Sequence, residues 1–199
     1  QLARFTVGRM SRYCIGCHTR ADRGVRDFPV SWSSELGALT AAQRIEFYLA
    51  NRRYQSAFSA AVATAKIEGD GFAAREPRAW ILAIKRTMGM VVRVNDDPAQ
   101  AEDLAFSVYS NKTAPLYVRR EAAGWVRDIR EWRDEKRRAP KDVFKSAAIL
   151  LETRPSFVRA LRASAMFHGL LEDSKSPRYA DAMYYSGLAA AQLRELNMD

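Results

Sequence analysis

Residues 116–138 read LYVRREAAGWVRDIREWRDEKRR, and the spacing of their apolar members indicates the class of fold. These apolar residues recur at intervals of three and four, at Val118, Ala122, Trp125, Ile129 and Trp132. Because an α-helix turns once in about 3.6 residues, that period places them on one helix face. The charged residues between them fall on the other face, where unlike charges four positions apart can neutralise one another. The segment therefore predicts a long amphipathic helix that packs along one side.

Prolines mark where further helices are expected to begin. Proline is favoured in the first turn of a helix, because its missing N–H would be unpaired there anyway. Asp97 and Ser176 each precede a proline, and we expect both to be N-caps. Pro77, Pro115 and Pro155 lie 38 and 40 residues apart, and a second proline follows each of them, at Pro98, Pro140 and Pro177.

This spacing predicts about four helical hairpins of roughly 39 residues, the length range of helix-pair repeats. Small residues cluster at 56–61 and 187–191, and we expect helices to pack closely there. Tyr48, Tyr54 and Ala57 match part of the tetratricopeptide consensus, so the body resembles that repeat family. We therefore expect an all-α solenoid of helical-hairpin repeats over residues 38–199. The expected helix pairs are 40–51 with 53–67, 77–94 with 98–109, 116–138 with 140–151, and 155–172 with 177–196.

Residues 1–37 have a different composition. They show little apolar periodicity and contain several breakers of regular structure, at Gly8, Gly16, Gly24, Pro29 and Gly37. We expect an irregular N-terminal arm over 1–37. A segment of this length forms scarcely any core of its own, so the arm must rest on the helical body or on a neighbouring subunit.

The arm contains the motif Cys14-Ile15-Gly16-Cys17-His18, a C-x-x-C-H sequence. This spacing attaches a c-type haem covalently. Two thiols add to the two vinyl groups of one porphyrin, and the adjacent imidazole binds the iron. The motif predicts one covalently attached haem c, with Cys14 and Cys17 as anchors and His18 as the proximal iron ligand.

The motif has three other interpretations. A structural zinc site needs four ligands, and His168 is the only further cysteine or histidine in the chain. A thioredoxin-like redox pair belongs in a βαβ pattern, which does not surround this motif. A plain disulfide between Cys14 and Cys17 is the third interpretation. The complete C-x-x-C-H sequence favours haem over all three.

Through this motif the chain resembles the c-type cytochromes, and specifically their monohaem members, since the motif occurs once. The resemblance covers only five of the 199 residues. The remainder does not look like the small cytochrome c fold, nor like the cytochrome c′ bundle, whose motif lies in the last helix. In bacteria such haem is attached after export. The resemblance therefore implies a periplasmic or extracellular protein, and a mature form without its leader peptide.

The sixth iron ligand decides whether such a haem carries electrons or performs chemistry. A second strong ligand favours electron transfer, whereas an open position admits small molecules such as peroxide, oxygen or nitric oxide. His168 is the only other imidazole and lies in an apolar helical segment. The alternative is a methionine, with Met88 and Met90 ahead of the other four.

Composition and charge narrow the partners. Hydrophobic residues make up 48% and charged residues 28%, and no apolar run is long enough to span a membrane, so neither disorder nor a transmembrane segment is expected. The net charge of +9 suits an anionic surface, a nucleic acid or an acidic protein. An exported cytochrome rarely meets nucleic acid, which favours an acidic redox partner. Residues 136–138 and Lys141 are a candidate docking patch for it, although much of this charge can be an ordinary paired surface.

We expect a one-electron carrier rather than an enzyme, held in a larger redox assembly or in a homopolymer whose arm lies on the next subunit. One alternative is a haem enzyme or gas sensor with an open iron site. Another is a helical-repeat interaction module in which the haem only staples the N-terminus.

Overall fold

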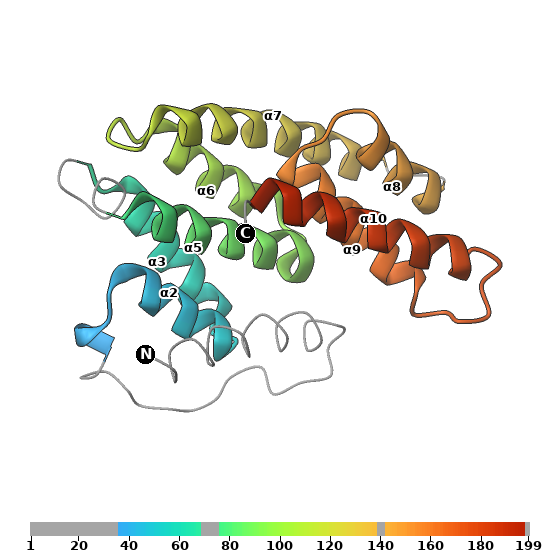
Figure 1. Cartoon of the computed structure of the whole chain (residues 1–199), viewed down its shortest axis with the longest axis horizontal. Helices are drawn as coiled ribbons and strands as arrows, with labels where there is room; N and C mark the ends of the chain where they lie inside the picture. Colours follow the sequence, from blue (N-terminus) through green and yellow to red (C-terminus); the bar gives the residue numbers. More distant parts are fainter. Residues whose placement is uncertain (1–35, 69–75, 139–141, 198–199) are drawn as a thin grey trace. The chain divides into compact units, whose positions relative to one another are not determined.

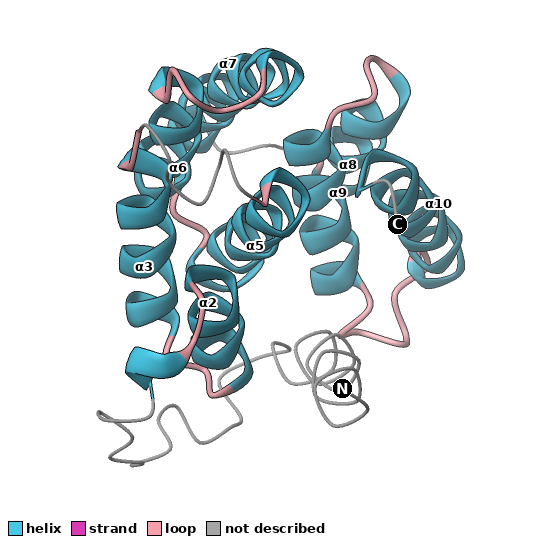
Figure 2. Ribbon diagram, turned by 60° about the vertical axis from the view of Figure 1, so that its left-hand side comes forward, coloured by secondary structure: helices cyan, strands magenta, loops and turns pink. Residues whose placement is uncertain are grey.

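The computed structural model describes residues 36–68, 76–138 and 142–197. Within these ranges it contains eight α-helices and no strand (Figures 1 and 2). The expected all-α class is thereby confirmed for the described part of the chain. The predicted arm lies outside the described residues, except for Leu36 and Gly37 in the short helix η1 (Leu36–Ala38).

Each of these eight helices overlaps one of the eight segments expected from the sequence. A π-helical turn, η2 (Val91–Asn95), directly continues one of them and extends it almost to the next helix. The helices are α2 (Ala41–Ala50), α3 (Tyr54–Lys66), α5 (Pro77–Met90), α6 (Pro98–Ser110), α7 (Leu116–Arg138), α8 (Val143–Glu152), α9 (Phe157–Leu170) and α10 (Tyr179–Asn197).

The starts of α5 and α6 follow the proline expectation. Pro77 and Pro98 are their first residues. The carboxylate of Asp97 accepts hydrogen bonds from the backbone N–H groups of Ala99 and Gln100, at 2.8 and 3.2 Å. Asp97 is therefore an N-cap, as expected, and it supplies acceptors for two N–H groups that the helix leaves unpaired.

The expected starts of α8, α9 and α10 are a few residues too early. α8 begins at Val143, because Asp142 accepts from the N–H of Lys145 at 3.0 Å. α9 likewise begins after Ser156, its N-cap. Ser176 accepts from the N–H of Arg178 within a turn that precedes α10, so it does not cap that helix. A side-chain oxygen can accept a hydrogen bond from an unpaired N–H of the first helical turn, whereas a proline only lacks an N–H of its own. The capping residue, and not the proline, therefore sets where α8 and α9 begin.

The helices belong to two compact units, and the division passes through α6 and α7. The first unit contains α2, α3, α5 and residues 107–119. The second contains η2, residues 98–106 of α6, residues 120–138 of α7, and helices α8, α9 and α10.

The core of the first unit lies where α2, α3 and α5 pack together. Ile45 of α2 and Trp80 and Met88 of α5 are completely buried there. Burying each such side chain contributes about 1.5–3 kcal/mol. Asn111 fastens the end of α3, because its side-chain amide donates to the carbonyls of Ala65 and Ile67, at 2.7 and 2.9 Å.

In the second unit, α9 packs against both α8 and α10. Every residue from Phe157 to Ser164 is buried, so this helix forms the centre of the unit. The rings of Trp125 and Phe157 lie 5.6 Å apart between their centres. The small residues at 187–191 behave differently from expectation: Ala189 is buried, whereas Gly187, Leu188, Ala190 and Ala191 are exposed.

Candidate functional site

Cys14, Cys17 and His18 lie outside the described residues, so the predicted haem attachment stays a prediction. The three named candidates for the sixth ligand are described. Met88 and Met90 end α5 in the first unit, whereas His168 lies near the end of α9 in the second. The two methionines and His168 therefore belong to different units.

His168 is half-buried and has a defined hydrogen bond. Its Nδ1 lies 2.6 Å from the backbone oxygen of Ser164, one turn earlier on α9. A carbonyl oxygen can only accept, so Nδ1 donates in this contact, and in the neutral ring Nε2 then keeps the free lone pair. Histidines that bind metals commonly have this arrangement, in which one nitrogen donates to a carbonyl and the other binds the metal. The donor chemistry of His168 therefore fits an axial haem ligand through Nε2.

Met88 and Met90 are buried residues of the first unit. Their side chains are 0% and 2% exposed. Methionine commonly fills irregular gaps in a hydrophobic core, and neither thioether has solvent beside it. Binding to iron through either sulfur would require uncovering a side chain that is closed off from solvent. Met88 and Met90 are thus less accessible than the half-buried Met166, a difference that sequence spacing alone did not reveal.

A cavity of about 530 Å³ lies between α7, α8 and α9 in the second unit. Its volume falls in the range of small-molecule sites. Met166 of α9 lines this cavity and is half-buried. Sequence reasoning ranked Met166 below Met88 and Met90, because helical spacing does not reveal which thioether faces open space. The wall is largely apolar, with Trp132, Val143, Ile149, Leu150 and Met166.

Arg162 supplies a fixed charge on the wall of this cavity. Its guanidinium lies over the Trp132 ring, 5.5 Å from the ring centre, and its Nη2 donates to Glu135 at 2.5 Å. Burial lowers the pKa of Arg162, and the hydrogen bond and charge of Glu135 oppose that change. An arginine remains protonated in proteins, so the pair is an ion pair beside an apolar surface.

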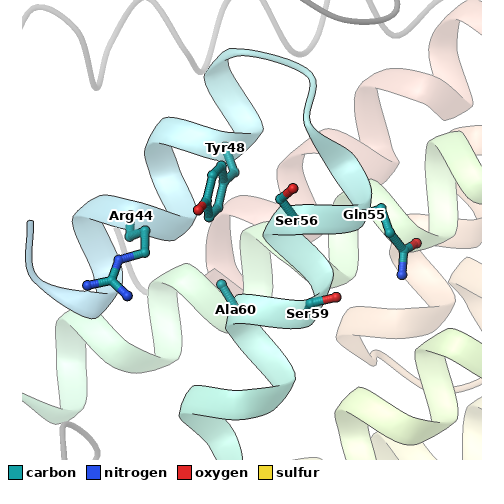
Figure 3. A pocket seen from close by; sticks show the side chains of 6 residues that line it. All are labelled: Arg44, Tyr48, Gln55, Ser56, Ser59 and Ala60. Atoms are coloured by element: carbon teal, nitrogen blue, oxygen red, sulfur yellow. The ribbon is translucent and has the colours of Figure 1, made fainter. Parts of the chain in front are cut away.

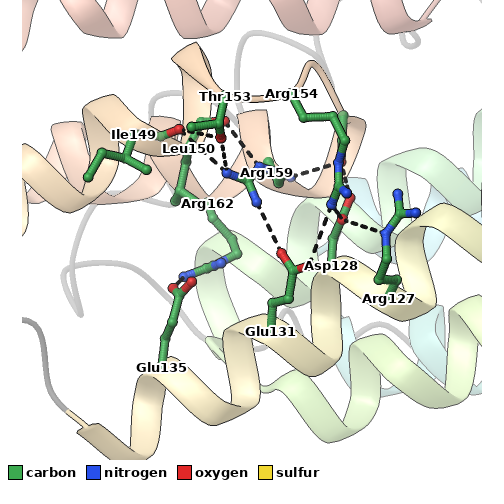
Figure 4. Close-up of polar contacts among 11 residues, drawn as sticks. Arg127, Asp128, Glu131, Glu135, Ile149, Leu150, Thr153, Arg154, Arg159 and Arg162 are labelled. Carbon is green, nitrogen blue, oxygen red and sulfur yellow. Dashed lines mark hydrogen bonds and ion pairs between the residues drawn. The ribbon is translucent and has the colours of Figure 1, made fainter.

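Arg159 ties the end of α8 to α7 (Figure 4). Its guanidinium donates to the backbone oxygens of Ile149 and Leu150, both at 3.4 Å, and to Glu131 at 3.1 Å. It also donates to the hydroxyl of Thr153. The last carbonyls of a helix lack the usual partner four residues on, and Arg159 donates to that of Leu150. The Ile149 oxygen also accepts from the N–H and the hydroxyl of Thr153, at 3.2 and 2.8 Å. We interpret its role as structural.

The Asp128 carboxylate is the other centre of this network. Its side chain is fully buried and accepts from Arg154 and from the Ser156 hydroxyl (Figure 4). Ser156 is the N-cap of α9, so Asp128 of α7 orients the residue at which α9 begins. Burying a charge is costly unless it is paired and hydrogen-bonded, and here it is both.

The basic residues of α7 find partners mainly on other elements. Arg130 and Arg133 both donate to Glu102 of α6, at 2.8 and 2.6 Å. Lys136, in the candidate docking patch, lies 2.7 Å from Asp96. Lys141 lies outside the described residues. Arg130, Arg133 and Lys136 are therefore part of an ordinary paired surface, which was the alternative to a docking patch.

A second, more polar depression of about 440 Å³ lies between α2 and α3 in the first unit (Figure 3). Both helices contribute to it, with Arg44 and Tyr48 from α2 and with serines from α3. The Arg44 guanidinium donates to the backbone oxygen of Leu39 at 3.4 Å. The lining residues are Arg44, Tyr48, Gln55, Ser56, Ser59 and Ala60, none of which is a carboxylate or an imidazole.

Comparison of the chain with protein-family models, with curated proteins and with solved structures finds no match in any of the three. Among the described helices, none is both long and apolar enough to cross a membrane. The described ranges also contain no group of three or more His, Cys, Asp or Glu residues placed to hold a metal ion. An axial haem ligand is a single side chain and needs no such group.

Proposed function

We propose that this protein is an exported monohaem c-type cytochrome that transfers one electron at a time. The observation that carries the proposal is the C-x-x-C-H motif at residues 14–18. Cys14 and Cys17 would hold the porphyrin, and His18 would bind the iron from the proximal side. When bound, the haem supplies an iron centre that gains and loses single electrons.

His168 is the proposed sixth ligand. Support comes from the hydrogen bond between its Nδ1 and the Ser164 carbonyl, which leaves Nε2 available. Two strong axial ligands favour electron transfer over chemistry at the iron. Met166 is the second choice, because it borders a cavity, and Met88 and Met90 follow because they fill the core. His168 and Met166 are two positions apart on α9 and so face roughly opposite sides of the helix.

The helical body is proposed to be a solenoid of about four hairpins that docks the haem against redox partners. The contacts of α2 with α3 and of α9 with α10 support it, because these are the first and the fourth of the expected helix pairs and the helices of one hairpin pack together in repeat proteins. The net charge of +9 favours an acidic partner protein. Assembly with further copies through the arm is part of the same proposal.

A second candidate is an interaction module in which the haem only fastens the arm. The observation that favours it is that the buried residues of both described cores, from Ile45 to Leu193, all come after the motif in the chain. The helical body thus has cores built from residues outside the haem motif. Under this hypothesis, partner binding would survive removal of the haem.

The test is an absorption spectrum of the full chain, produced in cells that attach c-type haem, before and after extraction with acid acetone. We expect haem that stays with the polypeptide, and a low-spin spectrum. Cys14→Ala combined with Cys17→Ala should abolish retention, whereas His168→Ala should retain haem but change its spin state. A colourless wild-type chain, made beside a c-type cytochrome that the same cells do load, would overturn the proposal.

A further inference from the structure

The cavity between α7, α8 and α9 has a buried cation in a largely apolar wall. Arg162 of α9 is buried and lines the cavity, and its guanidinium lies over the ring of Trp132. Burying a charge is costly unless the charge is paired, so this cation needs an anion beside it. With His168 as the iron ligand, the proposed electron carrier makes no use of the space that this wall encloses.

The present partner of Arg162 is the carboxylate of Glu135 on α7 (Figure 4). The Arg162 side chain is 7% exposed, whereas that of Glu135 is 50% exposed. The guanidinium is therefore fixed in the wall, while the carboxylate is already half in solvent and can turn outward at little cost. A second carboxylate can then take its place, and guanidinium groups bind carboxylates through two parallel hydrogen bonds.

The other two cations of the wall differ from Arg162. Lys136 is exposed and lies 2.7 Å from Asp96. Arg159 is held by the end of α8 and by Glu131. Burial lowers the pKa of Arg162, and the positive charge of Arg159 lowers it further, so this part of the wall favours an anion. Arg162 is thus the buried cation to which an anionic ligand can bind.

Helix α8 gives the cavity its apolar length. Val143, Ser146 and Leu150 line it at steps of three and four, which places them on one helix face. Val143 and Ile149 are 39% and 44% exposed, so apolar surface remains uncovered there. From Val143 to Leu150 the helix rises about 10 Å at about 1.5 Å per residue. An extended chain advances about 1.2 Å per bond, so this length suits about eight to ten carbons.

We propose that this cavity binds a free monocarboxylate with an apolar chain of about eight to ten carbons. The ligand carboxylate replaces Glu135 on Arg162, and the chain lies between α8 and the side chains of Trp132 and Met166. The thioether of Met166 can adapt to such a chain, because methionine is flexible and polarisable. All of these residues belong to the helical body, so the binding does not depend on haem.

Isothermal titration of the haem-loaded full chain with octanoate tests the proposal, with 1-octanol as the neutral ligand of the same chain length. We expect one octanoate per chain with a dissociation constant on the order of 100 µM, and binding of 1-octanol at least about tenfold weaker. A wild type that gives no binding heat up to about 5 mM octanoate, or equal affinity for the two ligands, would overturn the proposal.

A variant of Glu135 gives the sharper test, because a merely structural ion pair predicts the opposite result. Glu135→Gln should bind octanoate about three- to tenfold more tightly, since the ligand no longer competes with a carboxylate for Arg162. Asp134→Asn is the matched control, because Asp134 is 55% exposed on the same helix and is not among the residues that line the cavity. It removes the same charge and should change the affinity by less than about twofold. Equal effects of the two variants, or weaker binding by Glu135→Gln, would contradict the exchange of partners.

Removal of the cation should abolish the preference for the anion. Arg162→Gln should bind octanoate and 1-octanol with similar affinity, and circular dichroism shows whether this variant is folded. If it does not fold, the Glu135→Gln result decides. A folded Arg162→Gln that still prefers octanoate would refute the assigned role of Arg162.

A chain without haem separates this proposal from the proposed function. The double variant Cys14→Ala and Cys17→Ala should bind octanoate as tightly as the haem-loaded chain. Binding in the haem-free chain alone would show that haem occupies the cavity, which would overturn the proposal. Haem retention is read from the absorption spectrum, so either proposal can fail without the other.

Discussion

Removing the buried carboxylate of Asp128 should lower the free energy of unfolding by about 3 kcal/mol, the lower end for breaking a buried ion pair. Asp128 has a fully buried side chain, and it accepts from both Arg154 and Ser156. Two features keep the cost from being larger. Arg154 is 40% exposed, and it lies 3.6 Å from Glu131, so it would stay partly solvated and partly paired. The rest of the lost stability comes from Ser156, whose hydroxyl no longer has the Asp128 carboxylate as its acceptor. Ser156 is the N-cap of α9, so the start of that helix is held less firmly.

Thermal unfolding of the full-length Asp128→Ala variant, followed by circular dichroism, measures this effect. For a chain of this size, about 3 kcal/mol corresponds to a fall of roughly 6–12 °C in melting temperature. Asp134→Ala is the matched control on the same helix, because Asp134 is 55% exposed and lies 3.8 Å from Arg137. Such a surface pair should change stability by less than about 1 kcal/mol. Equal effects of the two substitutions would refute the reasoning from burial.

Four other substitutions probe different parts of the structure. His168→Ala should turn a low-spin haem spectrum into a high-spin one that shifts on adding cyanide, whereas Met88→Leu should leave the spectrum unchanged; the reverse result would make Met88 the ligand. Asn111→Ala should lower the free energy of unfolding by about 1–3 kcal/mol in urea titration, because it removes a donor from the buried carbonyl of Ala65, while Ile67 is exposed and its carbonyl can bind water. Gly187→Ala should raise the free energy of unfolding by about 0.5–1 kcal/mol in urea titration, because a Cβ there would meet no atom within 4 Å and alanine favours a helix over glycine; an equal or lower stability would contradict this.

The helices were predictable because their signals are local. The period of apolar residues in 116–138 specifies a helix within that segment, and the structure has α7 over the same residues. Asp97 likewise caps α6 through hydrogen bonds to residues two and three positions away. The starts of α8, α9 and α10 were less accurate, because a proline marks a helix start less firmly than a side-chain acceptor such as Asp142.

The partners of charged and small residues were harder to predict. Spacing along α7 suggested pairs four positions apart, but Arg130 and Arg133 both bind Glu102 of α6. The same limit applies to the small residues after Gly187, of which Ala189 faces the core and Ala190 and Ala191 face away. Contacts with residues distant in the chain decide both the ion-pair partners and which small residues are buried.

The sequence alone determined the eight helical segments, because the signals for a helix lie within a few positions of one another. The haem chemistry of residues 14–18 is likewise a prediction from neighbouring residues alone. Only the tertiary structure decided which candidate ligands are accessible. It buried Met88 in the core of the first unit and put Met166 beside a cavity in the second. It also enclosed the carboxylate of Asp128 between α7 and the start of α9. Burial depends on which helix faces cover one another, and contacts between distant residues set that arrangement.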